Sequence, residues 1–388
     1  MTWLKKLTWS FEGDKAIWTI LFLMSILSLA AVYSSTGDLA FTKRGGNTEF
    51  FLFRRFIVLL VGWIAAYIAH KIPVKYIKMI AVGALIFTIP MLIVNLLLGT
   101  RWAEIPVVNI SFQFSEVAKI TLLVYTSWQL ALHKDKLNDY RTFLKLIIPV
   151  VIVSGLIFIG DFSTAALVFF TNLVLIFMGR AKLKHLAATL ALLLLFAAGL
   201  YKLVTTYPEF GRFSTWNNRI ESYLNKGEDI NDGNYQITQS KIAISGGGLI
   251  GKLPGKSTQR YFLPEAHNDF IYAIIIEEYG SLIGTILLLS YLILLYRSIR
   301  IFMKSKRTFD KLVVLGIGFT LSFQAMINMG VSVGIFPVTG QTLPAISQGG
   351  TSVLVTFISI GIIQAVTSQN QETEEEKEVV KQESENYE

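Results

Sequence analysis

Two carboxylates and an imidazole lie within one short segment, residues 263–270, which reads LPEAHNDF. This segment runs directly into the apolar residues 271–276. A charged side chain beside a bilayer is costly to remove from water, so it needs either a capping role or a chemical one. Asp269 could be the acidic residue that helix N-termini favour, or a general base that takes a proton from a substrate. The residue types alone leave both interpretations open.

Glu265 and His267 come shortly before Asp269 in the same segment. Residues four apart share a face of a helix, so the carboxylates of Glu265 and Asp269 would be neighbours there. Close carboxylates raise the pKa of one member of the pair, which suits a general base or a divalent-cation site. We therefore expect Glu265 and His267 to support Asp269.

Glu116 and Lys119 form a second group, spaced by three residues in an apolar stretch. They could simply neutralise each other, or Lys119 could present its charge to an anionic lipid headgroup while Glu116 orients it. Arg101, followed by Trp102, fits an interfacial anchor or a phosphate clamp. Both interpretations of the Glu116–Lys119 pair stay open.

A third group is the segment 328–352, which is rich in Gly, Pro and hydroxyl residues and contains Ser347, Gly349 and Gly350. Such a composition at membrane depth indicates a re-entrant or broken segment that lines a cavity. Together the three groups predict an outward-facing polar cavity. Its substrate would be amphiphilic, with a charged head and a lipid tail.

Other motifs do not support a nucleotide or nucleic-acid function. Residues 246–251 match GxGxxG and follow the strand-like residues 241–245, but the βαβ unit that a dinucleotide site requires is missing. The net charge of +8 is spread over connecting loops, which is not the pattern of a nucleic-acid-binding face. The chain has no cysteine, which excludes disulfides and thiolate metal sites.

The elements that must position these groups are apolar helices. The chain of 388 residues is 53% hydrophobic and only 16% charged, which is typical of a polytopic all-α membrane protein. We predict ten transmembrane helices, at residues 16–34, 52–69, 77–98, 114–132, 143–160, 163–179, 184–204, 268–296, 312–336 and 347–367.

The distribution of Lys and Arg predicts the orientation. The basic residues of the connections 70–78, 133–145, 180–184 and 297–311 fall on one side together with both termini, so both termini should be cytoplasmic. The cluster 43–55 is the one group of several basic residues that falls on the opposite side. Residues 1–368 then form the transmembrane domain with a long extracytoplasmic loop at 205–267. The Glu-rich residues 369–388 should be a disordered acidic cytoplasmic tail.

The same motifs resemble the SEDS family (shape, elongation, division and sporulation) of bacterial cell-wall polymerases. Residues 263–271 are similar to its LPEAHTDFI segment, 245–251 to its SGG loop, 112–116 with Lys119 to its FQPSE…K helix, and 328–352 to its NxG…P…G…LP…SYGGSS ending. Phe114, Asn268 and Gln348 stand where Pro, Thr and Tyr are usual, and the neighbours of Asp161 differ from the usual PDFGT. Residues 216–220 and 235–244 are more similar to the division member of the family than to the elongation member.

The resemblance implies a peptidoglycan glycosyltransferase that polymerises lipid II at the outer face of the cytoplasmic membrane. The expected location within that membrane is the division septum. It implies that Asp269 is catalytic. The expected substrate-binding residues are Arg101, Glu116, Lys119, Glu265, His267, Ser347, Gly349 and Gly350. A divalent cation (Mg or Mn) is implied as cofactor, and a class B penicillin-binding protein (a transpeptidase) and other divisome proteins are implied as partners.

Three alternatives remain at this point. The chain could be the elongation-type polymerase of the same family. A flippase for a lipid-linked precursor would also need a polar cavity among ten helices. A non-catalytic scaffold could recruit partners through the acidic tail. Acidic residues gathered on the outward side favour the enzyme.

Overall fold

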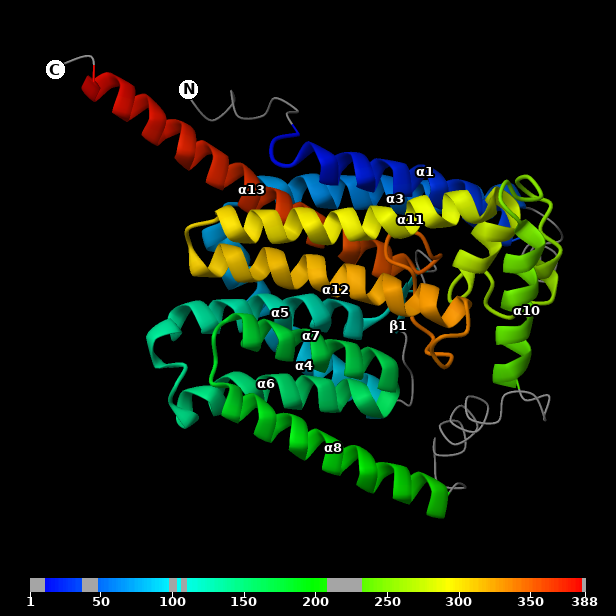
Figure 1. The fold of residues 1–388 in the computed structure, drawn as a ribbon, viewed down its shortest axis with the longest axis horizontal. Helices are drawn as coiled ribbons and strands as arrows, with labels where there is room; N and C mark the ends of the chain where they lie inside the picture. Colours follow the sequence, from blue (N-terminus) through cyan, green and yellow to red (C-terminus); the bar gives the residue numbers. More distant parts are fainter. Residues whose placement is uncertain (1–10, 37–47, 98–102, 106–109, 208–231, 386–388) are drawn as a thin grey trace.

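The computed structural model describes residues 11–36, 48–97, 103–105, 110–207 and 232–385, and within these ranges it is a helical bundle (Figure 1). Eight helices are long and apolar enough to cross a membrane, and α7 is a shorter apolar helix. With α5 they match the ten predicted spans, so the predicted fold class is confirmed. The ten are α1 (Lys15–Ser35), α3 (Thr48–Lys71), α4 (Val74–Leu97), α5 (Phe114–Leu132), α6 (Tyr140–Gly160), α7 (Phe162–Met178), α8 (Leu183–Thr206), α11 (Ile271–Lys304), α12 (Thr308–Ser332) and α13 (Gly350–Glu385).

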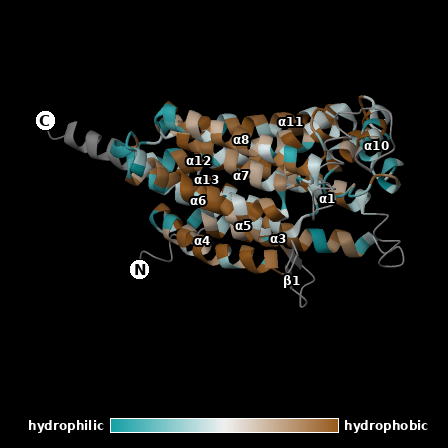
Figure 2. Cartoon of the chain, turned by 90° about the horizontal axis from the view of Figure 1, so that it is seen from below, coloured by the Kyte–Doolittle hydropathy of each residue, from teal (hydrophilic) through white to brown (hydrophobic). Residues whose placement is uncertain are grey.

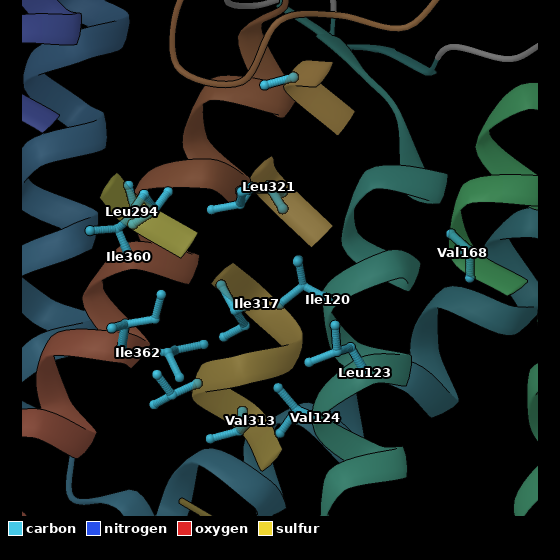
Figure 3. Close-up of a cluster of buried hydrophobic side chains, with 14 of the residues drawn as sticks. Ile120, Leu123, Val124, Val168, Leu294, Val313, Ile317, Leu321, Ile360 and Ile362 are labelled. Atoms are coloured by element: carbon cyan, nitrogen blue, oxygen red, sulfur yellow. The ribbon is translucent and has the colours of Figure 1, made fainter. Parts of the chain in front are cut away.

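Helix α12 lies at the centre of the bundle and α8 at its edge. The buried share of the apolar window is 78% in α12 and 83% in α13, but 6% in α8. Figure 3 shows the core contact: Val313, Ile317 and Leu321 of α12 lie between Leu123 of α5 and Ile360 of α13. Because lipid is as apolar as these side chains, close packing rather than hydrophobicity selects which helices meet here.

Polar residues gather at the two ends of the bundle, and apolar residues cover its length (Figure 2). At one end Asp14 caps α1, and its carboxylate accepts from Arg297 of α11 at 2.6 Å. The Asp14 backbone N–H donates to Oε1 of Gln364 of α13 at 2.7 Å. The start of α1 and the last part of the apolar stretch of α13 therefore share one end. Which side of a membrane this end faces stays a prediction.

Helix α11 departs from the predicted single span at 268–296. Gly280 has φ 82° and ψ 166°, which breaks the helix. The Tyr272 hydroxyl donates to the Gly284 carbonyl at 3.3 Å, although residues this far apart would be separated by ~18 Å along a straight helix. Residues 271–279 therefore form a short helix that folds back on the long part, 281–304. The prediction of one continuous span was wrong at this point.

The long outward connection contains a further helix, α10 (Asp232–Gly247). Residues 241–245, which looked strand-like, belong to it, because Ser240 and Ala243 are buried where α10 packs on α11 and α12. The Ser240 hydroxyl donates to the Ser332 carbonyl at 2.7 Å. Two short strands, β1 (Ala103–Ile105) and β2 (Ile110–Phe112), pair antiparallel. They are the only strands in the described residues.

The C-terminal segment also differs from its prediction. Helix α13 continues to Glu385, so the backbone of the tail that was expected to be disordered is helical over most of its length. The reason is composition: Glu, Lys and Gln are strong helix formers, and they extend a helix that the core has already nucleated.

Candidate active site

Asp269 lies in a tight turn at the end of the bundle opposite to Asp14. Glu265 adopts a left-handed φ of 54°, and its carbonyl accepts from the Asp269 backbone N–H at 3.1 Å. Phe270, not Asp269, is the N-cap residue of α11, and it makes no side-chain cap bond. Asp269 is half-buried and lies one residue before the N-cap, so it is not the capping residue of α11.

The backbone of this turn is held by two other elements. Asn328 of α12 donates its Nδ2 to the Asp269 carbonyl at 2.8 Å and to the Gln341 carbonyl at 2.7 Å. The Ser347 hydroxyl donates to the Asn268 carbonyl at 2.6 Å. Ser347 is buried, with 1% of its surface exposed, so the turn is fixed from inside the bundle.

The segment 333–349 between α12 and α13 is irregular and enters the bundle, as its composition predicted. Leu343, Ala345 and Ile346 are each at most 1% exposed. A Cβ added to Gly340, which has φ 71°, would lie 3.7 Å from Oδ2 of Asp269. The carboxylate of Asp269 thus lies beside the backbone of Gly340, which carries no side chain at this point.

Glu265 and His267 lie in the same turn. Oε2 of Glu265 accepts from Asn268 Nδ2 at 2.7 Å and lies 3.6 Å from Nε2 of His267. The Glu265 side chain is 57% exposed and that of His267 is 16% exposed. The helical spacing that would pair the carboxylates of Glu265 and Asp269 does not apply, because the segment is a turn rather than a helix.

Arg55 of α3 holds the re-entrant segment from the other side. It is 3% exposed. Its guanidinium donates to the carbonyls of Ser347, Ala345 and Ile346, each at 2.9 Å, and to the Ser28 hydroxyl from Nε at 2.9 Å. A rigid fork of five N–H donors suits several carbonyls at once. Arg55 belongs to the basic cluster 43–55 that looked misplaced; residues 43–47 lie outside the described residues.

Glu116 and Lys119 form an ion pair inside the bundle. Nζ of Lys119 is 2.8 Å from Oε2 of Glu116, and the two side chains are 2% and 5% exposed. Lys119 also donates to Oε1 of Gln324 in α12 at 2.7 Å, and Gln324 donates to the Thr342 carbonyl at 3.0 Å. The pair is therefore connected to the same re-entrant segment as Asp269.

A second acidic pair, Glu277 and Glu278, lies at the break in α11 and is fully buried. Glu277 accepts from Lys252 Nζ at 2.7 Å, and Glu278 accepts from the backbone N–H of Ser257 at 3.3 Å. These acidic residues face protein, as intramembrane charges require.

The glycines of residues 246–251 let the following loop pack closely against Glu277 and Glu278. Backbone bonds join Lys252 to Glu277 and Ser281 to Gly248, each at 2.9 Å, so the loop lies against the two sides of Gly280. A Cβ on Gly247, Gly251 or Gly280 would overlap the facing backbone. The glycines therefore serve close approach of two protein segments, and not of a nucleotide.

Three predicted residues, Gly349, Gly350 and Arg101, remain, together with Asp161 of the family pattern. Gly350 is the first residue of α13, and the Gly349 carbonyl accepts from Val353 N–H at 3.1 Å, so both lie beside Ser347 at the start of that helix. Arg101 lies outside the described residues. Asp161 caps α7 through the Thr164 backbone N–H at 3.1 Å.

A metal ion needs several side-chain ligands close together. Among the described residues no group of three or more His, Asp and Glu side chains could hold a metal ion. The predicted divalent cation therefore has no complete protein-only site in this part of the chain.

Three residues that position the site are not among those that the sequence predicted: Arg55, Asn328 and Gln324. Arg55 had a usable signal, because an arginine within an apolar span is rare and marks a buried interaction. Asn328 and Gln324 are neutral amides on α12, and their residue type does not reveal which carbonyls they meet.

A family model described as "Cell cycle protein", which carries the names FtsW, RodA and SpoVE, matches residues 14–372. A probable peptidoglycan glycosyltransferase FtsW of Coxiella burnetii is 32% identical over 373 residues, covering 92% of this chain and 96% of the relative. One of Thioalkalivibrio sulfidiphilus is 32% identical over 359 residues, covering 88% and 86%.

Solved structures share the fold. A chain of a peptidoglycan synthase complex superposes with a TM-score of 0.73 at 23% identity, covering 92% of this chain and 98% of that one. The rod shape determining protein RodA of Thermus thermophilus gives a TM-score of 0.64 at 23% identity, covering 92% and 97%. The resemblance found in the sequence is thus confirmed: this chain belongs to the cell cycle protein family of FtsW, RodA and SpoVE.

Proposed function

We propose that this chain is a peptidoglycan glycosyltransferase that polymerises lipid II at the outer face of the cytoplasmic membrane, in wall synthesis at the division septum. One observation carries the proposal: a half-buried carboxylate, Asp269, lies in a turn that is fixed from α12 and from the re-entrant segment. A carboxylate next to Gly340, on a turn whose backbone is held in place, meets the geometric need of a general base. The relatives named above, which are called peptidoglycan glycosyltransferases, support the same reaction.

In the proposed mechanism the acceptor sugar hydroxyl attacks the anomeric carbon of the donor. Its proton passes to the Asp269 carboxylate as the new glycosidic bond forms. The bond from the anomeric carbon to the lipid pyrophosphate breaks, and the pyrophosphate leaves with the electron pair. Asp269 then returns its proton to solvent, which restores the base.

Charge on the leaving pyrophosphate needs donors nearby. Arg101 is the proposed phosphate contact, and His267 and Glu265 are the proposed sugar contacts because they share the turn with Asp269. Backbone at Gly349 and Gly350, beside Ser347, would admit the substrate closely. Lys119 is engaged by Glu116 and Gln324, so we propose that it supports the re-entrant segment and meets substrate only when that pair opens.

The expected cofactor and partners belong to the same proposal. A divalent cation, Mg or Mn, would be shared between the pyrophosphate and the protein, since pyrophosphate supplies its own oxygen ligands. A class B penicillin-binding protein would crosslink the glycan that this chain makes, with other divisome proteins at the septum. The solved peptidoglycan synthase complex, which is named for polymerization and crosslinking, supports a joint assembly.

The test separates polymerisation from lipid transport. The purified full chain, with and without a class B penicillin-binding protein, is given lipid II, and glycan products are separated by length. We expect polymer. Rapid scrambling of labelled lipid II across proteoliposomes without any polymer would instead support the flippase and overturn the enzyme.

A further inference from the structure

The weakly packed helix α8 leaves an apolar crevice against α7. Its volume is about 270 Å³. The α8 face consists of Leu183, Leu186, Ala187 and Leu190, which recur at helical spacing, and Phe177 is among the α7 residues opposite. Pockets for drug-sized ligands are ~300–1,000 Å³, so the crevice fits part of one hydrocarbon chain.

The position of the crevice separates it from the catalytic site. Thr164, in the first turn of α7, accepts from Gln341 at 2.8 Å, next to Gly340 and Asp269. The start of α7 is therefore at the Asp269 end. Phe177 and Leu183 flank the turn at the other end of α7, so the crevice opens at the end opposite to Asp269.

Positive charge surrounds the mouth of the crevice. Arg180, Lys182 and Lys184 lie in the α7–α8 turn and its first helical residues, and all three are exposed. None of them forms an ion pair with a side chain of the described residues. Arg180 has φ 70°, which makes the turn sharp and keeps these cations close to Leu183.

α8 is also held in a way that leaves the crevice open. Its contacts to α6 are aromatic: the His185 ring lies 5.1 Å from that of Phe143, and the Phe196 ring lies 6.0 Å from that of Phe158. These contacts attach α8 along α6, and they leave the side toward α7 lined by aliphatic groups. A gap of this kind in a bilayer is filled by lipid tails.

We propose that this crevice binds an anionic phospholipid, with one acyl chain between α7 and α8 and its phosphate headgroup on Arg180, Lys182 and Lys184. The apolar lining selects the chain, and the free cations select the charge. The lipid fills the space beside the helix with the least protein contact, and so holds α8 at a defined distance from α7.

The first test blocks the crevice. The full chain is purified in detergent, and binding of dioleoyl-phosphatidylglycerol is measured by native mass spectrometry. Ala187→Trp fills the crevice, whereas Ala188→Trp places the same ring on a neighbouring residue that does not line it. We expect affinity to fall at least tenfold in Ala187→Trp only. Equal affinity in the two variants would overturn the proposal.

The second test removes the charge and does not depend on the folding of the tryptophan variants. Lys182→Gln/Lys184→Gln should reduce the preference for phosphatidylglycerol over phosphatidylcholine about thirtyfold, from ~1 kcal/mol for each basic residue near an anionic headgroup. Lys304→Gln/Lys306→Gln removes the same charge from exposed positions at the α11–α12 connection and should leave the preference unchanged. Equal loss in both double variants would mean a general charge effect and would overturn the site.

Discussion

Arg55 should control the rate of the reaction although it does not touch substrate. It binds the carbonyls of Ala345, Ile346 and Ser347, and Ser347 in turn binds the Asn268 carbonyl beside Asp269. A displacement of the re-entrant segment would therefore also move the turn 263–270 that carries Asp269, called the catalytic turn below. The perturbation that tests this is Arg55→Met, which keeps the length of the side chain and removes its donors.

The expected size follows from the hydrogen bonds. Arg55→Met leaves the carbonyls of Ala345 and Ser347 without the donors that Arg55 supplies, at about 1–3 kcal/mol for each unsatisfied buried acceptor. The Ile346 carbonyl keeps a bond from the Ser28 hydroxyl at 3.0 Å. The total of about 2–6 kcal/mol is partly offset because a buried charge is also removed. We expect the re-entrant segment to open locally while the bundle stays folded.

Two measurements follow on purified protein. Hydrogen exchange should increase in residues 263–270 and 343–349 but not in α12. kcat for lipid II polymerisation should fall about 100-fold, since a misplacement of about 1 Å can cost that much. Arg55→Lys keeps the charge without the fork and should show an intermediate loss. Arg300→Met is the control, because Arg300 lies near the end of α11 that is far from Asp269. Wild-type exchange and wild-type kcat in Arg55→Met would refute the reasoning.

Three further predictions concern the supports of the site. Lys119→Met should lower the free energy of unfolding by about 3–5 kcal/mol, because Glu116 is left buried and unpaired; the double change Lys119→Met/Glu116→Gln should recover most of this in thermal unfolding, and no recovery would contradict the ion-pair account. Gly280→Ala should destabilise the chain by more than the ~1–3 kcal/mol of a strained backbone alone, because its Cβ would overlap the Leu249 carbonyl, and an unchanged melting temperature would exclude this. Asn328→Ala should lower kcat with little change in KM; a change in KM alone would assign Asn328 to substrate binding instead.

The sequence predicts the helices well because their signal is local. Each span is an apolar run, and most predicted limits lie within a few residues of the observed ones. The break at Gly280 has a weaker signal: Glu277 and Glu278 interrupt the otherwise apolar residues 271–296, but the glycine itself looks like any small residue. Only the Leu249 carbonyl packed against it explains why the helix must turn there.

The site was predicted in part for a related reason. Asp269 and Ser347 stand out as polar residues beside apolar segments, and the structure connects them through the Asn268 carbonyl. Arg55 lies far from them in the sequence, and its three carbonyl partners are visible only when the re-entrant segment is folded into the bundle. An arginine within an apolar span indicates a buried interaction, but backbone acceptors carry no residue-type signal, so the partners of Arg55 could not be read from the sequence.

The central claim is that Asp269 accepts the proton of the acceptor hydroxyl, and one substitution tests it most directly. Asp269→Asn keeps the shape of the side chain and removes its basicity, and Asp139→Asn makes the same change at the α6 N-cap, far along the chain from the catalytic turn. We predict that lipid II polymerisation falls about 100- to 10,000-fold in Asp269→Asn and is unchanged in Asp139→Asn. Full polymerisation by folded Asp269→Asn would contradict the account.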